Sequence, residues 1–401
     1  MKGFSTFRMP KAVIYGNGAI TNLGAQAALL GKTALIISDS IMEKLGNVDT
    51  CENYLEKEGV SFVRYVEVNS EPTDVHVSEA LAILKEKQCD LIVAVGGGSC
   101  LDVAKAVAVV ATNGGYIGDY MGGKRKIAHS PIPFITIPTT AGTGSEVTDV
   151  TVINNTKDDI KMMIKDPAFY SDVAIVDPIL TYSAPPSVTA ATGIDALCHA
   201  IEAFISRRSQ PLTDNLALSA IELIMKNLRA AYIDGKNAEA REKMALASMQ
   251  AGMAFTNASV TLVHGMSRPI GALFHVAHGI SNAMLLPPVV EFSKEHATER
   301  LAVIGRLLRP DLATFSNSEL ADVVAVEIKK LCNDLKIPNM KAYGIDKERF
   351  GQVVSKMATD ALASGSPGNN PRVPSHEEIV DLYYTCYDYD FSVKEKETIN
   401  Q

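Results

Sequence analysis

Cysteine is scarce in this sequence, and its spacing excludes the common cysteine-based sites. The 401 residues include six cysteines, and no two of them are separated by two residues as in a CxxC motif. Zinc knuckles and thioredoxin-type redox sites need that spacing, so neither is expected. The cysteines are scattered through apolar segments, which is typical of reduced, buried thiols. They are Cys51, Cys89, Cys100, Cys198, Cys332 and Cys386.

Basic clusters and long apolar runs are also missing. The formal net charge is −8, and the short basic run Lys124-Arg125-Lys126 reads as a solvated glycine-rich loop, so no nucleic-acid partner is expected. No uninterrupted apolar stretch reaches the roughly 20 residues that a membrane span needs. The first residues lack the long apolar segment of a signal peptide. We therefore expect a cytoplasmic protein with no membrane partner.

The first half of the chain alternates short apolar runs with helical patterns. The expected helices include residues 77–86 and 101–111, and the expected strands span residues 34–38, 61–66, 91–95, 134–137 and 173–176. Continuous apolar strands that alternate with helices predict a parallel sheet covered on both faces.

The second half has a different rhythm. From about Ser187 onward, apolar residues recur at intervals of three and four, which predicts helices and no strand. The Pro185-Pro186 pair marks the expected boundary. The sequence therefore predicts an α/β domain at residues 1–186 and an all-helical domain at residues 187–401.

A glycine run follows one of the expected strands. Gly96-Gly97-Gly98-Ser99 lies between the strand at 91–95 and a helix with Asp102 in its first turns. Glycine lets the backbone approach a ligand, and the N–H groups at a helix N-terminus favour an anion such as pyrophosphate. The run is not the GxGxxG fingerprint, and a plain strand–turn–helix link would look the same.

A second polar loop strengthens the case for a dinucleotide. The run from Thr139 to Glu146 follows the strand at 134–137 and offers four hydroxyls and two glycines. Two such loops after parallel strands fit a cofactor at the carboxyl edge of the sheet. The candidate cofactor-binding residues in the two loops are Gly97, Gly98, Ser99, Asp102, Thr139, Thr140, Thr143 and Ser145.

Asp39 is a further cofactor candidate, because it lies just past the first expected strand. A carboxylate there could bond a ribose 2′-hydroxyl and would repel a 2′-phosphate, which favours NAD over NADP. It could equally be an ordinary N-cap of the next helix.

A possible metal site lies in the second half. Asp195 and His199 are four residues apart on an expected helix and so project from the same face, and His264 and His278 follow downstream. Three imidazoles and one carboxylate suit a first-row divalent metal. One carboxylate against a dication leaves about +1, so the metal would remain a Lewis acid. Taken singly, Asp195 and His199 could be an ordinary pair on a helix surface, and each histidine could be a buried core residue.

Together these residues resemble the iron-containing (group III) alcohol dehydrogenases over essentially the whole chain. The string Gly-Ile-Asp-Ala-x-x-His-Ala-x-Glu at 193–202 is the most specific mark. The other marks are the two glycine loops, Asp177-Pro178, His264-Gly265-Met266, His278-Gly279 and Gly368-Asn369-Asn370-Pro371-Arg372.

The resemblance implies an enzyme that transfers a hydride between NAD and a small primary alcohol or aldehyde. It implies Asp195, His199, His264 and His278 as ligands of Fe²⁺, or in some relatives Zn²⁺. It also implies Asp39 at the adenosine ribose, Lys161 near the cofactor and a homo-oligomer, a dimer or larger.

The chain departs from the family pattern at one position. Many relatives have a histidine four residues after the third ligand, where this chain has Arg268. Arginine stays protonated at neutral pH and cannot serve as an acid–base group. Arg268 would then recognise a carboxylate or sulfonate of the substrate, or pair with an acidic residue or a cofactor phosphate while His275 relays the proton.

Two alternatives to an alcohol dehydrogenase remain at this point. One is a polyol (glycerol-type) dehydrogenase or a dehydroquinate-synthase-like enzyme of the same architecture, whose ligand set would differ. The other is a non-catalytic scaffold that binds nucleotide and metal.

Overall fold

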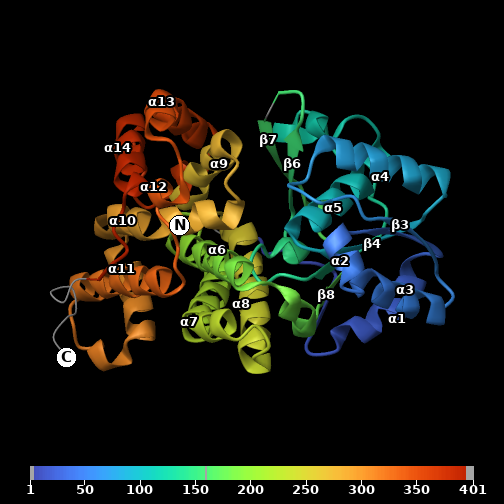
Figure 1. Cartoon of the computed structure of the whole chain (residues 1–401), viewed down its shortest axis with the longest axis horizontal. Coiled ribbons are helices and arrows are strands. Elements are labelled where there is room, and N and C mark those ends of the chain that lie inside the picture. The colour runs from blue at the N-terminus through green and yellow to red at the C-terminus, as the bar shows by residue number, and fades with distance from the viewer. Residues whose placement is uncertain (1–3, 159, 394–401) are drawn as a thin grey trace. The chain divides into compact units, whose positions relative to one another are not determined.

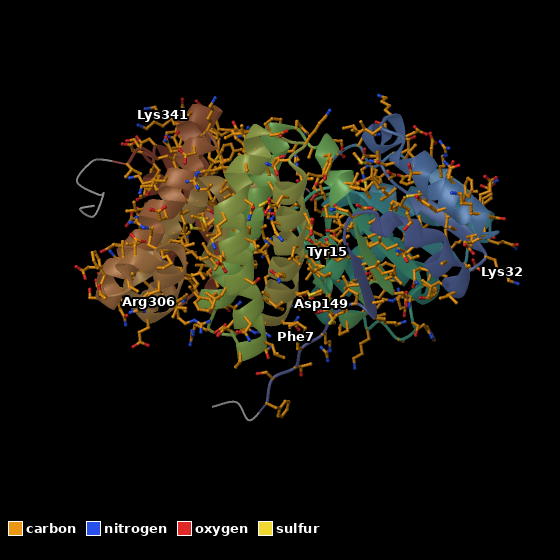
Figure 2. The ribbon with its side chains drawn as sticks, turned by 90° about the horizontal axis from the view of Figure 1, so that it is seen from below. Phe7, Tyr15, Lys32, Asp149, Arg306 and Lys341 are labelled. Carbon is orange, nitrogen blue, oxygen red and sulfur yellow. The ribbon has the colours of Figure 1, made fainter. Side chains whose placement is uncertain are left out.

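The computed structural model describes residues 4–158 and 160–393. Its chain divides into two compact units. The α/β unit is Arg8–Ala184, and the helical unit joins residues 4–7 to the chain from Pro185 onward. Figure 2 shows the side chains of each unit, with Lys32 exposed on the α/β unit and Lys341 exposed on the helical unit.

The α/β unit is built on a six-stranded sheet in the order β1-β8-β5-β4-β2-β3, in which every pairing is parallel. The strands are β1 Ala12–Tyr15, β2 Thr33–Ile37, β3 Ser61–Tyr65, β4 Leu91–Gly96, β5 Phe134–Pro138 and β8 Val173–Val176. The five strands expected from the sequence and the parallel sheet are thus confirmed.

Helices cover both faces of this sheet. Alternate side chains of β2 face opposite cores, since Leu35 and Ile37 belong to one cluster and Ala34 and Ile36 to the other. The first cluster packs under α4 Asp74–Glu86 and α5 Gly98–Asn113, and the second packs under α1 Leu23–Leu30 and α3 Asn47–Lys57 (Figure 1). The short helix α2 is Ser40–Lys44.

The sequence analysis missed three strands. β1 is a four-residue edge strand whose residues are only half-buried, so it lacks the apolar run of a central strand. β6 Val150–Asn155 and β7 Ile160–Lys165 form a separate antiparallel pair. Polar residues interrupt their apolar pattern, because only part of each strand is buried.

The order of the strands creates a switch point between β2 and β4. The chain runs from β2 outward to β3 and then returns to β4 on the other side of β2. Ligands of open α/β sheets bind beyond the carboxyl ends of the strands at such a point. Asp39 follows β2 and Gly97 follows β4, so both lie beyond those ends.

The helical unit contains no strand between Pro185 and residue 393. Its helices are α6 Pro186–Ile205, α7 Pro211–Ile233, α8 Ala238–Ala258, α9 Leu262–Phe274, α10 His278–Leu308, α11 Asn317–Asp334, α12 Met340–Tyr343, α13 Lys347–Ala363 and α14 His376–Tyr387. α6 contacts α7, α8 and α10 and forms the centre of the unit.

α6 has the length and composition of a possible membrane span, a feature that the search for apolar runs did not single out. However, 89% of its apolar window is buried inside the structure. Such burial is typical of a core helix. All six cysteines are free and buried, as expected.

The contact between α1 and α3 depends on a glycine. A Cβ atom added at Gly24 would lie 2.1 Å from the backbone oxygen of Tyr54. Because the obstacle is backbone, the two helices must separate to make room. We expect Gly24→Ala to lower the free energy of unfolding by about 1–3 kcal/mol, as measured by urea denaturation.

Gly351→Ala is the matched control. Gly351 lies inside α13, and the nearest heavy atom to an added Cβ is the Tyr384 hydroxyl at 3.9 Å. We expect no loss of stability there, since alanine favours a helix by about 1 kcal/mol over glycine. Equal stability of Gly24→Ala and the parent protein would contradict the packing argument.

Candidate metal centre and cofactor loops

α6 carries the first two residues of the metal group. Asp195 and His199 lie one turn apart and are 1% and 4% exposed. A Cβ added at Gly193 would come within 2.3 Å of a methyl group of Leu228, so glycine allows α7 to pack tightly against this part of α6. The two ligand-type side chains are therefore held in the core of the helical unit.

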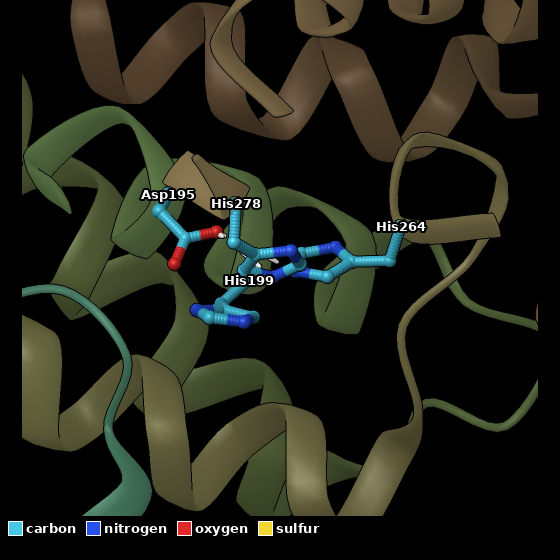
Figure 3. A group of neighbouring side chains, drawn as sticks. All are labelled: Asp195, His199, His264 and His278. Carbon is cyan, nitrogen blue, oxygen red and sulfur yellow. Dashed lines mark ion pairs between the residues drawn. The ribbon is translucent and has the colours of Figure 1, made fainter. Parts of the chain in front are cut away.

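The other two residues come from the following helices. His264 lies in α9, and His278 is the first residue of α10. One candidate ligand atom from each of Asp195, His199, His264 and His278 can be chosen so that all lie within 4.8 Å of one another (Figure 3). The His264 Nε2 and His278 Nε2 atoms lie 3.5 Å and 3.8 Å from the same Asp195 oxygen.

This donor set fits a first-row divalent metal. Imidazole nitrogens and a carboxylate are common ligands of iron and zinc. Burial would raise the pKa of Asp195, but the neighbouring histidines outweigh it and hold the pKa below its ordinary value. Asp195 is therefore ionised and available to bind a cation, although it is buried away from water.

Glu202 is a residue of the centre that the sequence analysis did not include among the site residues. Its Oε2 forms a hydrogen bond with Nδ1 of His264. Its Oε1 accepts hydrogen bonds from the Thr261 backbone N–H (3.0 Å), the Thr261 hydroxyl (2.7 Å) and the Val263 N–H (2.8 Å). Glu202 lies three residues after His199 on α6, and this helical spacing was a signal available in the sequence.

The charges of this pair shift both side chains. Burial would raise the pKa of Glu202, but the charge of His264 and the hydrogen bonds outweigh it, so the pKa is lowered. Burial would lower the pKa of His264, but Glu202 and Asp195 together raise it to about 9. Both shifts favour a strong hydrogen bond between the Glu202 carboxylate and the His264 ring.

Asn282 also borders the centre and was missed. Its side-chain nitrogen lies 2.6 Å from Asp195 Oδ1 and 3.1 Å from both His264 Nε2 and His278 Nε2. It follows His278 by one turn of α10, so the same helical spacing places it here.

In the α/β unit, the two predicted loops lie against each other. Gly97 is the N-cap of α5 and provides no side-chain cap, which leaves this helix N-terminus suited to an anion. A Cβ at Gly98 would lie 2.9 Å from the Thr143 side chain, and one at Gly97 would lie 3.9 Å from Thr140. Glycine at 98 thus permits the close approach of the two loops.

A hydrogen bond between Ser145 of the second loop and Asp102 of α5 also links the two loops. The Ser145 hydroxyl donates to Asp102 (2.6 Å), and the Val152 N–H donates to the other Asp102 oxygen (2.9 Å). Burial raises the pKa of Asp102 despite these bonds.

Thr139 is 3% exposed and its N–H donates to the Gly96 oxygen, so it joins the ends of β5 and β4. Ser99 lies in the first turn of α5.

Asp39 has the N-cap geometry that was one of its two interpretations. One carboxylate oxygen accepts from the Ile41 and Met42 N–H groups, both at 2.9 Å. The second oxygen lies 3.5 Å from the Cys100 sulfur in the first turn of α5. Lys161 lies on β7 and forms an ion pair with Glu71 at 2.5 Å.

Arg268 and His275 lie toward the end of α9. Arg268 follows His264 by one turn, and burial lowers its pKa to about 10, so it remains a cation at neutral pH. His275 ends the helix in the left-handed region with φ of 54°, and its side chain is exposed.

Comparison with known proteins assigns the family. Residues 10–178 match the model of iron-containing alcohol dehydrogenases, and residues 189–387 match the C-terminal model of the Fe-containing alcohol dehydrogenase family. A 1,3-propanediol dehydrogenase of Klebsiella pneumoniae is 37% identical over 385 residues, which cover 95% of this chain and 98% of the relative.

Solved structures agree with this result. A crystal structure of a 1,3-propanediol oxidoreductase has a TM-score of 0.92 at 36% identity and covers 96% of this chain and 100% of that one. A sulfoacetaldehyde reductase from Bifidobacterium kashiwanohense, solved in complex with NAD⁺, has a TM-score of 0.86 at 29% identity, with coverage of 96% and 100%. The resemblance seen in the sequence is confirmed: the chain belongs to the iron-containing alcohol dehydrogenase family.

Proposed function

We propose that this protein is an iron-dependent, NAD-linked dehydrogenase that interconverts a small primary alcohol and its aldehyde. The observation that carries the proposal is the buried group of Asp195, His199, His264 and His278 in a chain of this family. Fe²⁺ is the expected metal, and Zn²⁺ suits the same donors.

The chemistry divides between bound groups and side chains. When bound, the divalent metal supplies a Lewis acid for the carbonyl oxygen, and NADH supplies the hydride. Asp195 contributes the negative charge that retains the cation, while the three imidazoles add no charge when neutral. Burial of Asp195, His199 and His264 keeps water from weakening these interactions.

The cofactor is proposed to lie at the switch point of the α/β unit. The uncapped N-terminus of α5 suits its pyrophosphate, and the Asp39 carboxylate, whose second oxygen has only the weak Cys100 thiol as a donor, suits the ribose of NAD. Thr139, Thr140, Thr143 and Ser145 supply the second loop, and we also assign Lys161 of β7 to the cofactor. The relative solved with NAD⁺ supports the choice of cofactor.

The remaining roles concern the proton and the substrate tail. We assign proton relay to His275, whose exposed ring can exchange protons with water. We assign recognition of a carboxylate or sulfonate to Arg268, which remains a cation at neutral pH. The relative named sulfoacetaldehyde reductase supports an anionic substrate. A cytoplasmic homodimer or larger homo-oligomer completes the proposal.

The metal requirement is the first test. We expect metal-stripped protein to be inactive in anaerobic NADH oxidation with small aldehydes, and Fe²⁺ or Zn²⁺ to restore turnover. His264→Ala should reduce activity at least about 100-fold, because loss of a ligand exceeds the 10–100-fold cost of changing its supporting residues. His129→Ala removes an exposed imidazole of the α/β unit and should leave activity unchanged. Turnover without metal would refute the proposal, and absence of turnover with any metal or aldehyde would favour a non-catalytic scaffold.

Asp39 is expected to select NAD over NADP. Asp39→Ser removes the charge but keeps a good N-cap residue, so α2 should remain intact. We expect the ratio of kcat/KM for NADPH to that for NADH to rise about ten-fold or more, since like charges cost at least about 1.4 kcal/mol. Asp346→Ser changes another N-cap, that of α13, and should leave this ratio unchanged. A similar ratio in Asp39→Ser and the parent protein would show that Asp39 caps α2 and does not select the cofactor.

Arg268 is expected to distinguish anionic from neutral aldehydes. Removal of a charged hydrogen bond costs about 1.5–3 kcal/mol, so Arg268→Ala should lower kcat/KM for an anionic aldehyde roughly 10- to 150-fold more than for propanal. Arg229→Ala removes an arginine paired with Asp334 on the surface and serves as the control. Equal losses for both aldehydes would exclude anion recognition by Arg268.

A further inference from the structure

We propose that Glu202 is a positioning residue that fixes the tautomer of His264 and balances the charge of the metal. The inference rests on the proposed metal site and adds a residue that does not itself bind the metal. It depends on three features of Glu202: its burial, the hydrogen bonds that orient it and its position behind His264.

The carboxylate of Glu202 has one orientation available. The residue is 1% exposed, and its Oε1 accepts from the two donors of Thr261 and from the Val263 N–H. These donors lie at the start of α9, where the helix dipole favours a negative charge. Oε1 therefore accepts its hydrogen bonds from these donors, and Oε2 points at His264.

This orientation decides which nitrogen of His264 carries the proton. An ionised carboxylate can only accept, so the Nδ1 that contacts Glu202 Oε2 must be the N–H donor. The lone pair of the neutral imidazole then lies on Nε2, which is 3.5 Å from the Asp195 carboxylate. Nε2 is therefore the atom offered to the metal, and Glu202 makes it a stronger base.

Glu202 also changes the charge of the centre. A dication with Asp195 alone would leave a charge of +1 on the ion and its ligands, and the Glu202 carboxylate behind His264 offsets that charge, which it also does for the neighbouring Arg268. Because an uncompensated buried charge is costly, the second carboxylate favours retention of a divalent ion. It does so without occupying a coordination position, so positions remain for the substrate.

The alternative is that Glu202 only caps α9. In that case its loss would lower stability but would leave the metal affinity of the folded protein unchanged. Metal affinity and apo-protein stability, measured separately, distinguish the two roles.

Glu202→Gln is the test, because an amide has one oxygen and cannot accept hydrogen bonds both from His264 and from Thr261 and Val263. If its oxygen faces His264 Nδ1–H, its NH₂ group faces the N–H donors of Thr261 and Val263. If its NH₂ group faces Nδ1, the lone pair must move to Nδ1 and Nε2 becomes protonated. We expect Zn²⁺ affinity, measured by competition with a chromophoric chelator, to fall 10- to 100-fold. We also expect altered d–d absorption of the Co²⁺-loaded variant, with the melting temperature of the metal-free variant recorded in parallel.

Two further variants serve as controls. Thr261→Val removes one donor to Oε1 and leaves the contact between Glu202 and His264, so it should lower stability and change Zn²⁺ affinity by less than Glu202→Gln does. Glu222→Gln neutralises an exposed carboxylate of α7 paired with Lys226 and should change neither. A folded Glu202→Gln protein with the parent's Zn²⁺ affinity would overturn the proposal.

A measurement on the unmodified protein covers the case in which Glu202→Gln does not fold. In ¹⁵N-histidine NMR of the Zn²⁺-loaded protein, we expect a protonated Nδ1 for His264, assigned by its loss in His264→Ala. A protonated Nε2 would overturn the inference. Both readouts are independent of turnover, so an inactive enzyme with a protonated Nδ1 would contradict the proposed function and leave the role of Glu202 intact.

Discussion

The organisation of the helical unit depends on one electrostatic constraint, the burial of carboxylates on α6. Asp195 and Glu202 are each 1% exposed on a helix whose other neighbours are mostly apolar. A buried carboxylate is tolerated only when positive charge or hydrogen bonds surround it. The histidines of α9 and α10, the N-terminus of α9 and Asn282 provide these partners. The packing of α6, α9 and α10 and the donor set of the metal site thus both follow from the need to surround these carboxylates with polar partners.

The α/β unit meets a different constraint, the close approach of the loops that follow β4 and β5. Here the important residues have small or absent side chains, because a helix N-terminus offers an anion its backbone N–H groups rather than side-chain charges. Gly97 and Gly98 leave that space, while Asp102 and Ser145 hold the loops together from behind. Asp102 therefore fixes the geometry of the loops, since its oxygens accept from Ser145 and Val152.

Sequence periodicity predicted the central strands and the helical second half, because continuous burial leaves a clear apolar pattern. It missed β1 and the β6–β7 pair, because half-buried edge segments carry no such pattern. The group of Asp195, His199, His264 and His278 was found because ligand chemistry restricts residue types. Glu202 and Asn282 were not, since an acidic or amide residue on a helix has many ordinary uses. Only the folded structure shows that Glu202 contacts Nδ1 of His264 rather than solvent.

All four candidate ligands belong to the helical unit, although α6 lies more than fifty residues before α9 and α10 along the chain. A bound ion would act there as a non-covalent cross-link, and its binding free energy would add to the stability of that unit. The α/β unit has no ligand in the group and gains nothing directly from the ion. Metal supply in the cell would then govern the lifetime of the protein as well as its activity, because an unmetallated helical unit opens more often and exposes its core to proteases.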